Sequence, residues 1–137
     1  MSAFEHALTV RFHEVDPAGI VFFGRIFGYA HDAYEAWIRT VGFPLEVPIA
    51  ERGYALPLAH AEADFHSPIR GGTELRVFLE VLSIGTSSFT VRSRILGKEG
   101  MRHATVETTH VCIDPAGGRP RPIPDDFRAA IEPYRTG

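Results

Sequence analysis

Hydrophobic and polar residues alternate along the first part of the chain. From Ala7 to His13, the apolar residues Leu8, Val10 and Phe12 occupy every second position. This period of two is typical of a strand with one buried face, because successive side chains of a strand point to opposite sides. The pattern therefore predicts a half-buried strand over residues 7–13.

The period changes to three and four residues between Phe23 and Val41, where the sequence predicts one long helix. Gly42 follows this segment and Pro44 comes soon after, and both are typical of a helix end. The apolar stripe of the helix should face a sheet. The stripe consists of Ile26, Phe27, Ala30, Tyr34, Trp37, Ile38 and Val41.

The second half of the chain alternates again and predicts four further strands. Short connections rich in glycine, proline and serine separate them, which favours antiparallel pairing. One strand, one long helix and four strands define an α+β domain, in which a curved antiparallel sheet wraps around the central helix. We expect such a small sheet, with its long alternating strands, to pair with a second copy at an edge or a face, which would form a dimer. The predicted strands cover residues 56–65, 74–81, 88–95 and 103–113.

The composition is that of one ordinary globular domain, which we assign to residues 1–137. Hydrophobic residues make up 45% of the 137 positions, and the formal net charge of −3 gives no basic field for nucleic acid. No apolar run approaches the roughly 18 residues that a membrane-spanning helix needs, and the first residues do not resemble a secretory signal. The single cysteine, Cys112, cannot form an internal disulfide and is expected in the core. We therefore expect a cytoplasmic protein with no membrane partner.

The first candidate for chemistry is Asp16, in a turn just before the predicted helix. Pro17 restricts the backbone around it, and Gly19 adds conformational freedom or a gap for the close approach of another molecule. N–H groups at a helix start lack partners within the helix, so they can polarise a carbonyl oxygen and stabilise an oxyanion. A carboxylate beside them can attack the carbonyl carbon or activate water. Thioester hydrolysis needs only these two parts, but the plain alternative is that Asp16 caps the helix.

A resemblance to a known family favours the catalytic interpretation. The segments Asp16-Pro17-Ala18-Gly19-Ile20-Val21-Phe22-Phe23 and Tyr29-Ala30-His31-Asp32-Ala33-Tyr34-Glu35 closely resemble the 4-hydroxybenzoyl-CoA thioesterase family of hotdog proteins. The match continues, over nearly the whole chain, with Glu51-Arg52-Gly53, Pro57, Ala63-Asp64-Phe65, Ser88-Phe89 and Arg121-x-Ile123. Relatives with the Asp-x-Ala-Gly-x-Val element act on short-chain, aromatic and dihydroxynaphthoyl-CoA esters, so this element marks the reaction better than the substrate.

The resemblance implies a hotdog fold and roles for single residues. Asp16 is implied to be the nucleophile or general base, and the backbone N–H of Phe23 is implied to polarise the thioester carbonyl. Family members form dimers with active sites at the subunit interface, and these often pair into tetramers. We therefore expect a homodimer that assembles into a homotetramer, in which His60 can reach the partner's site. The other expected substrate contacts are Gly19, Val21 and Phe22.

Coenzyme A is expected at the turn before the Ser88-Phe89 segment. Family members commonly have basic residues near this turn for the CoA phosphates, whereas Gly85-Thr86-Ser87 carries no positive charge. Hydroxyl and N–H groups of Ser87 and Ser88 would then make the contacts, with Arg121, which matches a family CoA contact. No cofactor is expected, because CoA is part of the substrate. Further basic candidates are Arg92, Arg94 and Arg119.

Four residues of metal-ligand type share one face of a predicted strand: His60, Glu62, Asp64 and His66. Neighbouring positions on that face are about 7 Å apart, so all four cannot close on one ion, although two could do so with ligands from elsewhere. A polar sheet face or a subunit contact is the plainer interpretation, and we expect no metal. On the helix, His31 and Glu35 are spaced to pair at the surface.

These patterns together predict an acyl-CoA thioesterase. The aromatic pair Phe22-Phe23 and the Asp16-Pro17 form of the motif favour an aromatic acyl group such as hydroxybenzoyl or benzoyl, since aromatic walls suit a flat ring. A short-chain acyl group is the alternative substrate. A weakly catalytic protein that binds acyl-CoA or an acyl-carrier partner also stays open, because the Gly85-Thr86-Ser87 turn offers no charge to the CoA phosphates.

Overall fold

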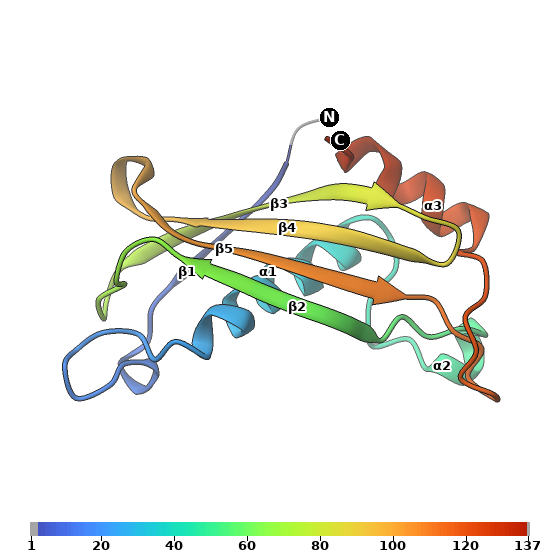
Figure 1. Ribbon diagram of the computed structural model, residues 1–137, viewed down its shortest axis with the longest axis horizontal. Helices are drawn as coiled ribbons and strands as arrows, with labels where there is room; N and C mark the ends of the chain where they lie inside the picture. The colour runs from blue at the N-terminus through green and yellow to red at the C-terminus, as the bar shows by residue number, and fades with distance from the viewer. Residues whose placement is uncertain (1–2, 137) are drawn as a thin grey trace.

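The computed structural model of the protein describes residues 3–136 (Figure 1). The predicted domain also includes residues 1, 2 and 137, which lie outside the described part. The strands are β1 (Phe4–Thr9), β2 (Leu58–Phe65), β3 (Glu74–Ile84), β4 (Ser88–Leu96) and β5 (Arg102–Val111). The helices are α1 (Arg25–Thr40), α2 (Ile49–Arg52) and α3 (Asp125–Ile131), with 3-10 turns η1 (Phe12–Glu14), η2 (Lys98–Gly100) and η3 (Glu132–Tyr134).

The strands form one antiparallel sheet with the order β1-β3-β4-β5-β2. Short connections join β3 to β4 and β4 to β5, whereas β2 pairs with β5 at the far edge. The sheet curves, and α1 lies against one of its faces (Figure 1). The predicted α+β architecture, a curved antiparallel sheet around one long helix, is therefore confirmed.

One face of α1 and the facing side of the sheet form the core. Trp37 is fully buried there, and its ring lies 6.5 Å from that of Phe89 in β4. Along the first part of β3 and most of β4, buried positions alternate with more exposed ones, as the sequence pattern predicts. Truncating a buried tryptophan to alanine typically costs about 3–5 kcal/mol. Packing of this kind anchors the helix, and with it the residues at its start, to the sheet.

The first strand and the long helix differ from their predicted bounds. β1 ends at Thr9 instead of continuing to residue 13, and Phe12 belongs to a 3-10 turn with 91% of its surface exposed. The prediction is wrong there because an exposed phenylalanine continues the alternation by chance. α1 begins at Arg25 rather than Phe23, and Phe23 and Gly24 form a turn that leads into it.

The edge strand β2 is exposed along almost its whole length. Its two ends carry large apolar side chains, with Leu58 55% exposed and Phe65 54% exposed. An edge strand of this length with apolar ends is a surface to which another strand can add. No helix within residues 3–136 is both long and apolar enough to cross a membrane.

Candidate active site

Asp16 lies in a tight loop closed by Val15 and Val21, which pair as an isolated antiparallel bridge. Its N–H donates to the Ile20 carbonyl at 2.8 Å. Its side-chain Oδ1 accepts from the N–H groups of Ala18 at 2.9 Å and Ile20 at 3.2 Å, a common way for aspartate to shape a turn. Within residues 3–136, no hydrogen bond uses the other oxygen, Oδ2. The loop therefore fixes the carboxylate and leaves one of its oxygens available.

Gly19 completes this loop in a conformation that favours glycine. Its φ of 78° is in the left-handed region, and its N–H donates to the Asp16 carbonyl at 2.9 Å. Its carbonyl accepts from the N–H of Gly71 at 3.2 Å. Apart from its two chain neighbours, no described residue would have an atom within 4 Å of a Cβ at position 19. Backbone conformation, rather than crowding by this chain, is therefore what requires glycine here.

Hydrogen bonds tie the loop to the rest of the fold on both sides. The Val21 N–H donates to the Ile69 carbonyl at 2.8 Å, and the Phe22 N–H donates to the Glu14 carbonyl at 3.1 Å. The Glu14 carboxylate in turn accepts from the Tyr29 hydroxyl of α1 at 3.0 Å. Burial and the hydrogen bond to Glu14 raise the pKa of Tyr29, so this hydroxyl stays protonated and keeps donating at neutral pH.

Asp16 does not cap the helix. The N-cap position of α1 is Gly24, which has no side-chain capping bond, and the first helical residue is Arg25. The alternative of a simple helix cap is therefore wrong, because the hydrogen bonds of Asp16 stay within its own loop. Among residues 3–136, no hydrogen bond uses the N–H of Phe23 or Gly24. They are the unpartnered donors expected at a helix start, and the Asp16 loop leads directly into them.

An apolar hollow of about 320 Å³ opens beside Phe23, between the start of α1 and the end of β2. Phe22 and Phe23 are 53% and 63% exposed, and Phe65 packs edge-on against Phe23 with ring centroids 6.5 Å apart. Exposed aromatic surface of this kind suits a flat ligand or a second protein surface. This helix-end hollow is lined by Ile20, Val21, Phe23, Phe65, Ser67 and His103, among others.

Two polar residues of the helix-end hollow were not expected from the sequence. The Ser67 hydroxyl donates to the Arg102 carbonyl at 2.6 Å, and its oxygen lies 3.0 Å from Nδ1 of His103. Ser67 follows β2, whereas His103 belongs to β5, so only the pairing of these strands brings them together. The same pairing puts Phe65 beside the hollow. The sequence marked Phe65 as part of a family match but not as a site residue.

The predicted CoA contacts lie at the opposite end of the sheet from the Asp16 loop (Figure 1). The Ser87 carbonyl accepts from the Cys112 N–H at 2.7 Å, and the Cys112 carbonyl accepts from the Arg121 N–H at 2.9 Å. Ser87, Ser88 and Arg121 are therefore neighbours. The length of β2 separates them from Asp16, which is roughly 25 Å at 3.3 Å per strand residue. A single chain does not bring these residues beside Asp16.

A cation at this turn was missed in the sequence. Arg128 of α3 donates to the carbonyls of Gly85 at 2.6 Å and Thr86 at 3.3 Å. The turn has no basic residue of its own, but the C-terminal helix supplies one. Arg121 donates to the Gly53 carbonyl at 3.1 Å. Both contacts join segments that are distant in the sequence, so no local motif could reveal them.

His60 is not brought to the helix-end hollow. Its Nε2 lies 3.2 Å from Oε1 of Glu62. Because Ala63 packs against the core, the alternating side chains of His60 and Glu62 lie on the sheet face away from α1. Within residues 3–136 there is no group of three or more side chains placed to hold a metal ion.

Arg92, a candidate for CoA binding, and the predicted pair of His31 and Glu35 also have other neighbours. Arg92 is ion-paired with the buried Glu80, with Nε and Oε1 2.8 Å apart. In the described part of the chain, His31 and Glu35 share no hydrogen bond or ion pair, so their expected pairing is not observed. The imidazole of His31 instead lies 5.9 Å from the Tyr34 ring.

Comparison with known proteins identifies the family. Residues 10–131 match the model of the Thioesterase-like superfamily. The chain is 32% identical over 126 residues to a 1,4-dihydroxy-2-naphthoyl-CoA hydrolase of Synechococcus elongatus, covering 91% of this chain and 92% of the relative. The crystal structure of a 1,4-dihydroxy-2-naphthoyl-CoA thioesterase from Synechocystis superposes with a TM-score of 0.87 at 31% identity, covering 94% and 95% of the two chains. A thioesterase-superfamily structure from Jannaschia sp. CCS1 superposes with a TM-score of 0.87 at 28% identity, covering 98% and 94%.

The chain belongs to the Thioesterase-like superfamily. The predicted hotdog fold is confirmed, and so is the predicted class of enzyme, an acyl-CoA thioesterase. The Synechococcus and Synechocystis relatives are named for a naphthoyl ester rather than a hydroxybenzoyl ester.

Proposed function

We propose that this acyl-CoA thioesterase hydrolyses an aromatic CoA ester, with Asp16 and the backbone N–H of Phe23 as its catalytic groups. One observation carries the proposal: a carboxylate fixed through one oxygen lies in a loop that leads directly into unpartnered N–H groups at a helix start. A carbonyl oxygen that accepts from these N–H groups is polarised, and negative charge that develops on it is stabilised.

Asp16 can then act by either of two balanced routes. In the first, its free Oδ2 attacks the carbonyl carbon, CoA leaves as the thiolate, and water hydrolyses the resulting mixed anhydride to the acid. In the second, Asp16 takes a proton from a water that attacks the carbonyl carbon, and the tetrahedral intermediate collapses with loss of the CoA thiolate. Both routes use the same N–H groups for the oxyanion.

The aromatic substrate class is supported by the surroundings of Phe23. Phe22, Phe23 and Phe65 present aromatic surface next to the N–H groups, and such surface packs well against a flat ring. Similar proteins are named for 1,4-dihydroxy-2-naphthoyl-CoA, so a hydroxylated two-ring acyl group is our first choice. Hydroxybenzoyl and benzoyl esters are smaller members of the same class. Short-chain esters remain the alternative substrate.

We further propose that the active unit is a dimer formed through β2, and that these dimers can pair into tetramers. A two-fold axis at an edge strand pairs that strand with its own copy in the antiparallel sense. This pairing would bring the Leu58 end of one β2 beside the Phe65 end of the other. The CoA residues Ser87 and Arg121 lie at the Leu58 end, so each set would then lie near the Asp16 loop of the partner. Within one chain the CoA residues are separated from the Asp16 loop, and this separation favours the arrangement.

The test is the release of free CoA thiol from 1,4-dihydroxy-2-naphthoyl-, 4-hydroxybenzoyl-, benzoyl- and short-chain CoA esters. The proposal expects the highest kcat/KM with an aromatic ester. A clear preference for short-chain esters would overturn the aromatic assignment. Binding of these esters without turnover would favour the weakly catalytic binding protein and overturn the catalytic roles.

A further inference from the structure

The Asp16 loop has two short arms, residues 14–16 and 20–22, which run antiparallel. The N–H groups of Asp16 and Phe22 each donate to a carbonyl of the opposite arm, at 2.8 and 3.1 Å. The first arm carries the Asp16 carboxylate, and the second arm leads into Phe23. Bonds within the loop orient the carboxylate, but the placement of the loop against α1 sets where it lies relative to the N–H groups at the helix start.

The second arm is fixed by the chain segment that follows β2. Val21 donates its N–H to the Ile69 carbonyl at 2.8 Å, and Ile20 forms an isolated antiparallel bridge with Arg70. These backbone contacts hold the arm that precedes the helix. The first arm, which carries the carboxylate, is fixed by different contacts.

Glu14 attaches the first arm to the helix. Its Oε1 accepts from the Tyr29 hydroxyl of α1 at 3.0 Å and from the Arg11 N–H at 2.7 Å. Tyr29 is only 2% exposed and lies about one turn after the helix start, so it is a rigid anchor. Arg25 also reaches the His13 carbonyl, but at 3.5 Å and at the surface. The bond between Tyr29 and Glu14 is therefore the firmer of these two links.

The chemistry of the Tyr29–Glu14 bond makes it a lasting contact. Burial and the Glu14 carboxylate raise the pKa of Tyr29, so its hydroxyl keeps its proton at neutral pH. Hydrogen bonds to an ionised acceptor are roughly twice as strong as those between neutral groups. Both donors meet the same oxygen of Glu14. A glutamine has an amide oxygen of the same reach, so it can accept the same two bonds without the charge.

We infer that Glu14 and Tyr29 are positioning residues, which hold the Asp16 carboxylate in place relative to the N–H of Phe23. The inference rests on the proposed function, because it has meaning only if Asp16 and Phe23 act on the thioester. Neither positioning side chain has to touch the substrate. A displacement of about 1 Å can lower a rate by about a hundredfold, so a loosened loop should slow the chemical step and leave binding of the ester largely unchanged.

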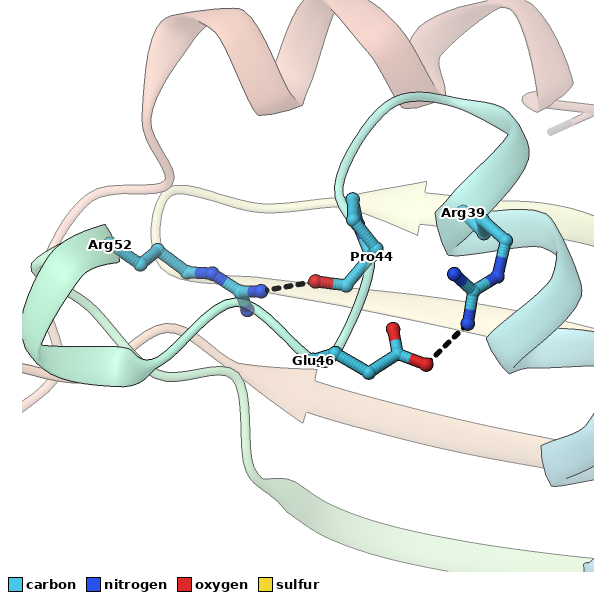
Figure 2. Close-up of polar contacts among 4 residues, drawn as sticks. All are labelled: Arg39, Pro44, Glu46 and Arg52. Atoms are coloured by element: carbon cyan, nitrogen blue, oxygen red, sulfur yellow. Dashed lines mark hydrogen bonds and ion pairs between the residues drawn. The ribbon is translucent and has the colours of Figure 1, made fainter.

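The other end of α1 has a comparable contact, roughly 20 Å along the helix axis from its start. Arg39 forms an ion pair with Glu46, and Arg52 donates to the Pro44 carbonyl at 2.8 Å, as Figure 2 shows. Like Glu14, Glu46 joins the helix to a neighbouring segment, although both side chains of its ion pair are exposed. Glu46→Ala is therefore the matched control for the loss of a glutamate that tethers α1.

The test measures kcat and KM of the variants on the ester that the wild-type enzyme hydrolyses best. Tyr29→Phe removes only a hydroxyl and should lower kcat about tenfold, with KM unchanged to within about twofold. Glu14→Ala removes both hydrogen bonds and should lower kcat by about a hundredfold. Glu14→Gln should retain most of the wild-type kcat, because its amide oxygen replaces the acceptor. Glu46→Ala should change neither constant.

The Tm of each variant is measured in parallel, because a purely structural role would lower Tm and leave the kcat of the folded enzyme unchanged. That result would overturn the inference. Equally large losses of kcat in Glu14→Gln and Glu14→Ala would also overturn it, since they would show that the charge matters rather than the hydrogen bonds.

Asp16→Asn reports separately on the proposed function. If this variant is as active as the wild type, the catalytic role of Asp16 fails and the inference falls with it. If Asp16→Asn is inactive while the Tyr29 and Glu14 variants match the wild type, only the present inference fails.

Discussion

The N–H of Asp16 donates to the carbonyl of Ile20 at 2.8 Å, and the N–H of Ile20 returns a hydrogen bond of 3.2 Å to the Asp16 carboxylate. This reciprocal pair fixes the carboxylate without a contact outside the loop, and it occupies Oδ1 alone. A carboxylate that is already oriented does not have to be ordered when the substrate binds. The loop therefore gives this half-exposed aspartate the fixed orientation that its proposed catalytic role requires.

Gly19→Asn should be tolerated better than Gly19→Val. The φ of 78° is accessible to asparagine but strained for a β-branched residue, and the left-handed conformation generally costs about 1–2 kcal/mol. Since no atom of the described chain would crowd a Cβ there, the strain should set the loss. The loss can be measured as the change in Tm on thermal unfolding and as the change in kcat/KM. Equal loss in the two variants would show that conformation is not the constraint.

Gly97→Ala should destabilise the protein, whereas Gly28→Ala should not. A Cβ at position 97 would lie 2.4 Å from Nε2 of His103, which is buried and held by Ser67. Overpacking of this kind typically costs about 1–3 kcal/mol. At position 28, inside α1, nothing in the described residues beyond the chain neighbours and the nearby helix backbone lies within 4 Å of the new Cβ. Glycine is also generally about 0.5–1 kcal/mol worse than alanine in a helix. Chemical denaturation of both variants checks the contrast, and similar effects would contradict it.

Stability should fall as the pH drops from about 6.5 to about 4, because of His110. Burial lowers its pKa to about 4 in the folded protein, so between these values the unfolded state binds the extra proton and gains stability. The full effect of such a shift is about 3 kcal/mol. This loss of stability is absent at pH values above the pKa of His110 in the unfolded state, and it is complete at pH values below the pKa of His110 in the folded state. His110→Phe should flatten this part of the curve of unfolding free energy against pH, and an unchanged slope would contradict the assignment.

Ala61→Pro should break the proposed β2 dimer without unfolding the subunit. The His66 N–H donates to the His103 carbonyl, and pairing alternates along an antiparallel ladder, so the N–H of Ala61 points to the open edge of β2. Proline there removes a donor from the edge only, which edge strands tolerate. Sedimentation should show monomers with native circular dichroism.

Glu62→Pro is the matched control for that experiment. Its N–H belongs to the ladder with β5, where Glu62 pairs with Glu107, so the change should destabilise the fold itself. If Ala61→Pro stays dimeric, β2 is not the interface.

Much of the fold was predictable because it follows from local patterns. The apolar stripe predicted the start of α1 to within two residues. The predicted start is too early because Phe23 fits the spacing of the stripe although its backbone is in a turn. The strands after α2 were predicted for the same reason. Their order in the sheet was not, because the pairing of β2 with β5 joins segments more than forty positions apart at one end, as Leu58 and His110 show.

The residues of the candidate site also divide into those that a local motif reveals and those that only the fold brings together. Asp16, Gly19 and Phe23 lie within one short motif, so the sequence revealed them together. Ser67 and His103 meet only through strand pairing, and Arg128 meets the Gly85 turn only when α3 folds back onto the sheet. His31 could not be interpreted from its spacing to Glu35. It lines a hollow between α1 and the strands β2 and β5, which only the fold forms.

The most direct test of the central claim is the kcat of Asp16→Asn on the ester that the wild-type enzyme hydrolyses best. Asparagine keeps an oxygen that can accept from Ala18 and Ile20, so the loop should survive, and an unchanged Tm checks this. Loss of a general base or nucleophile is expected to lower kcat by about a hundredfold or more. A folded variant with kcat close to that of the wild type would contradict the catalytic role of Asp16.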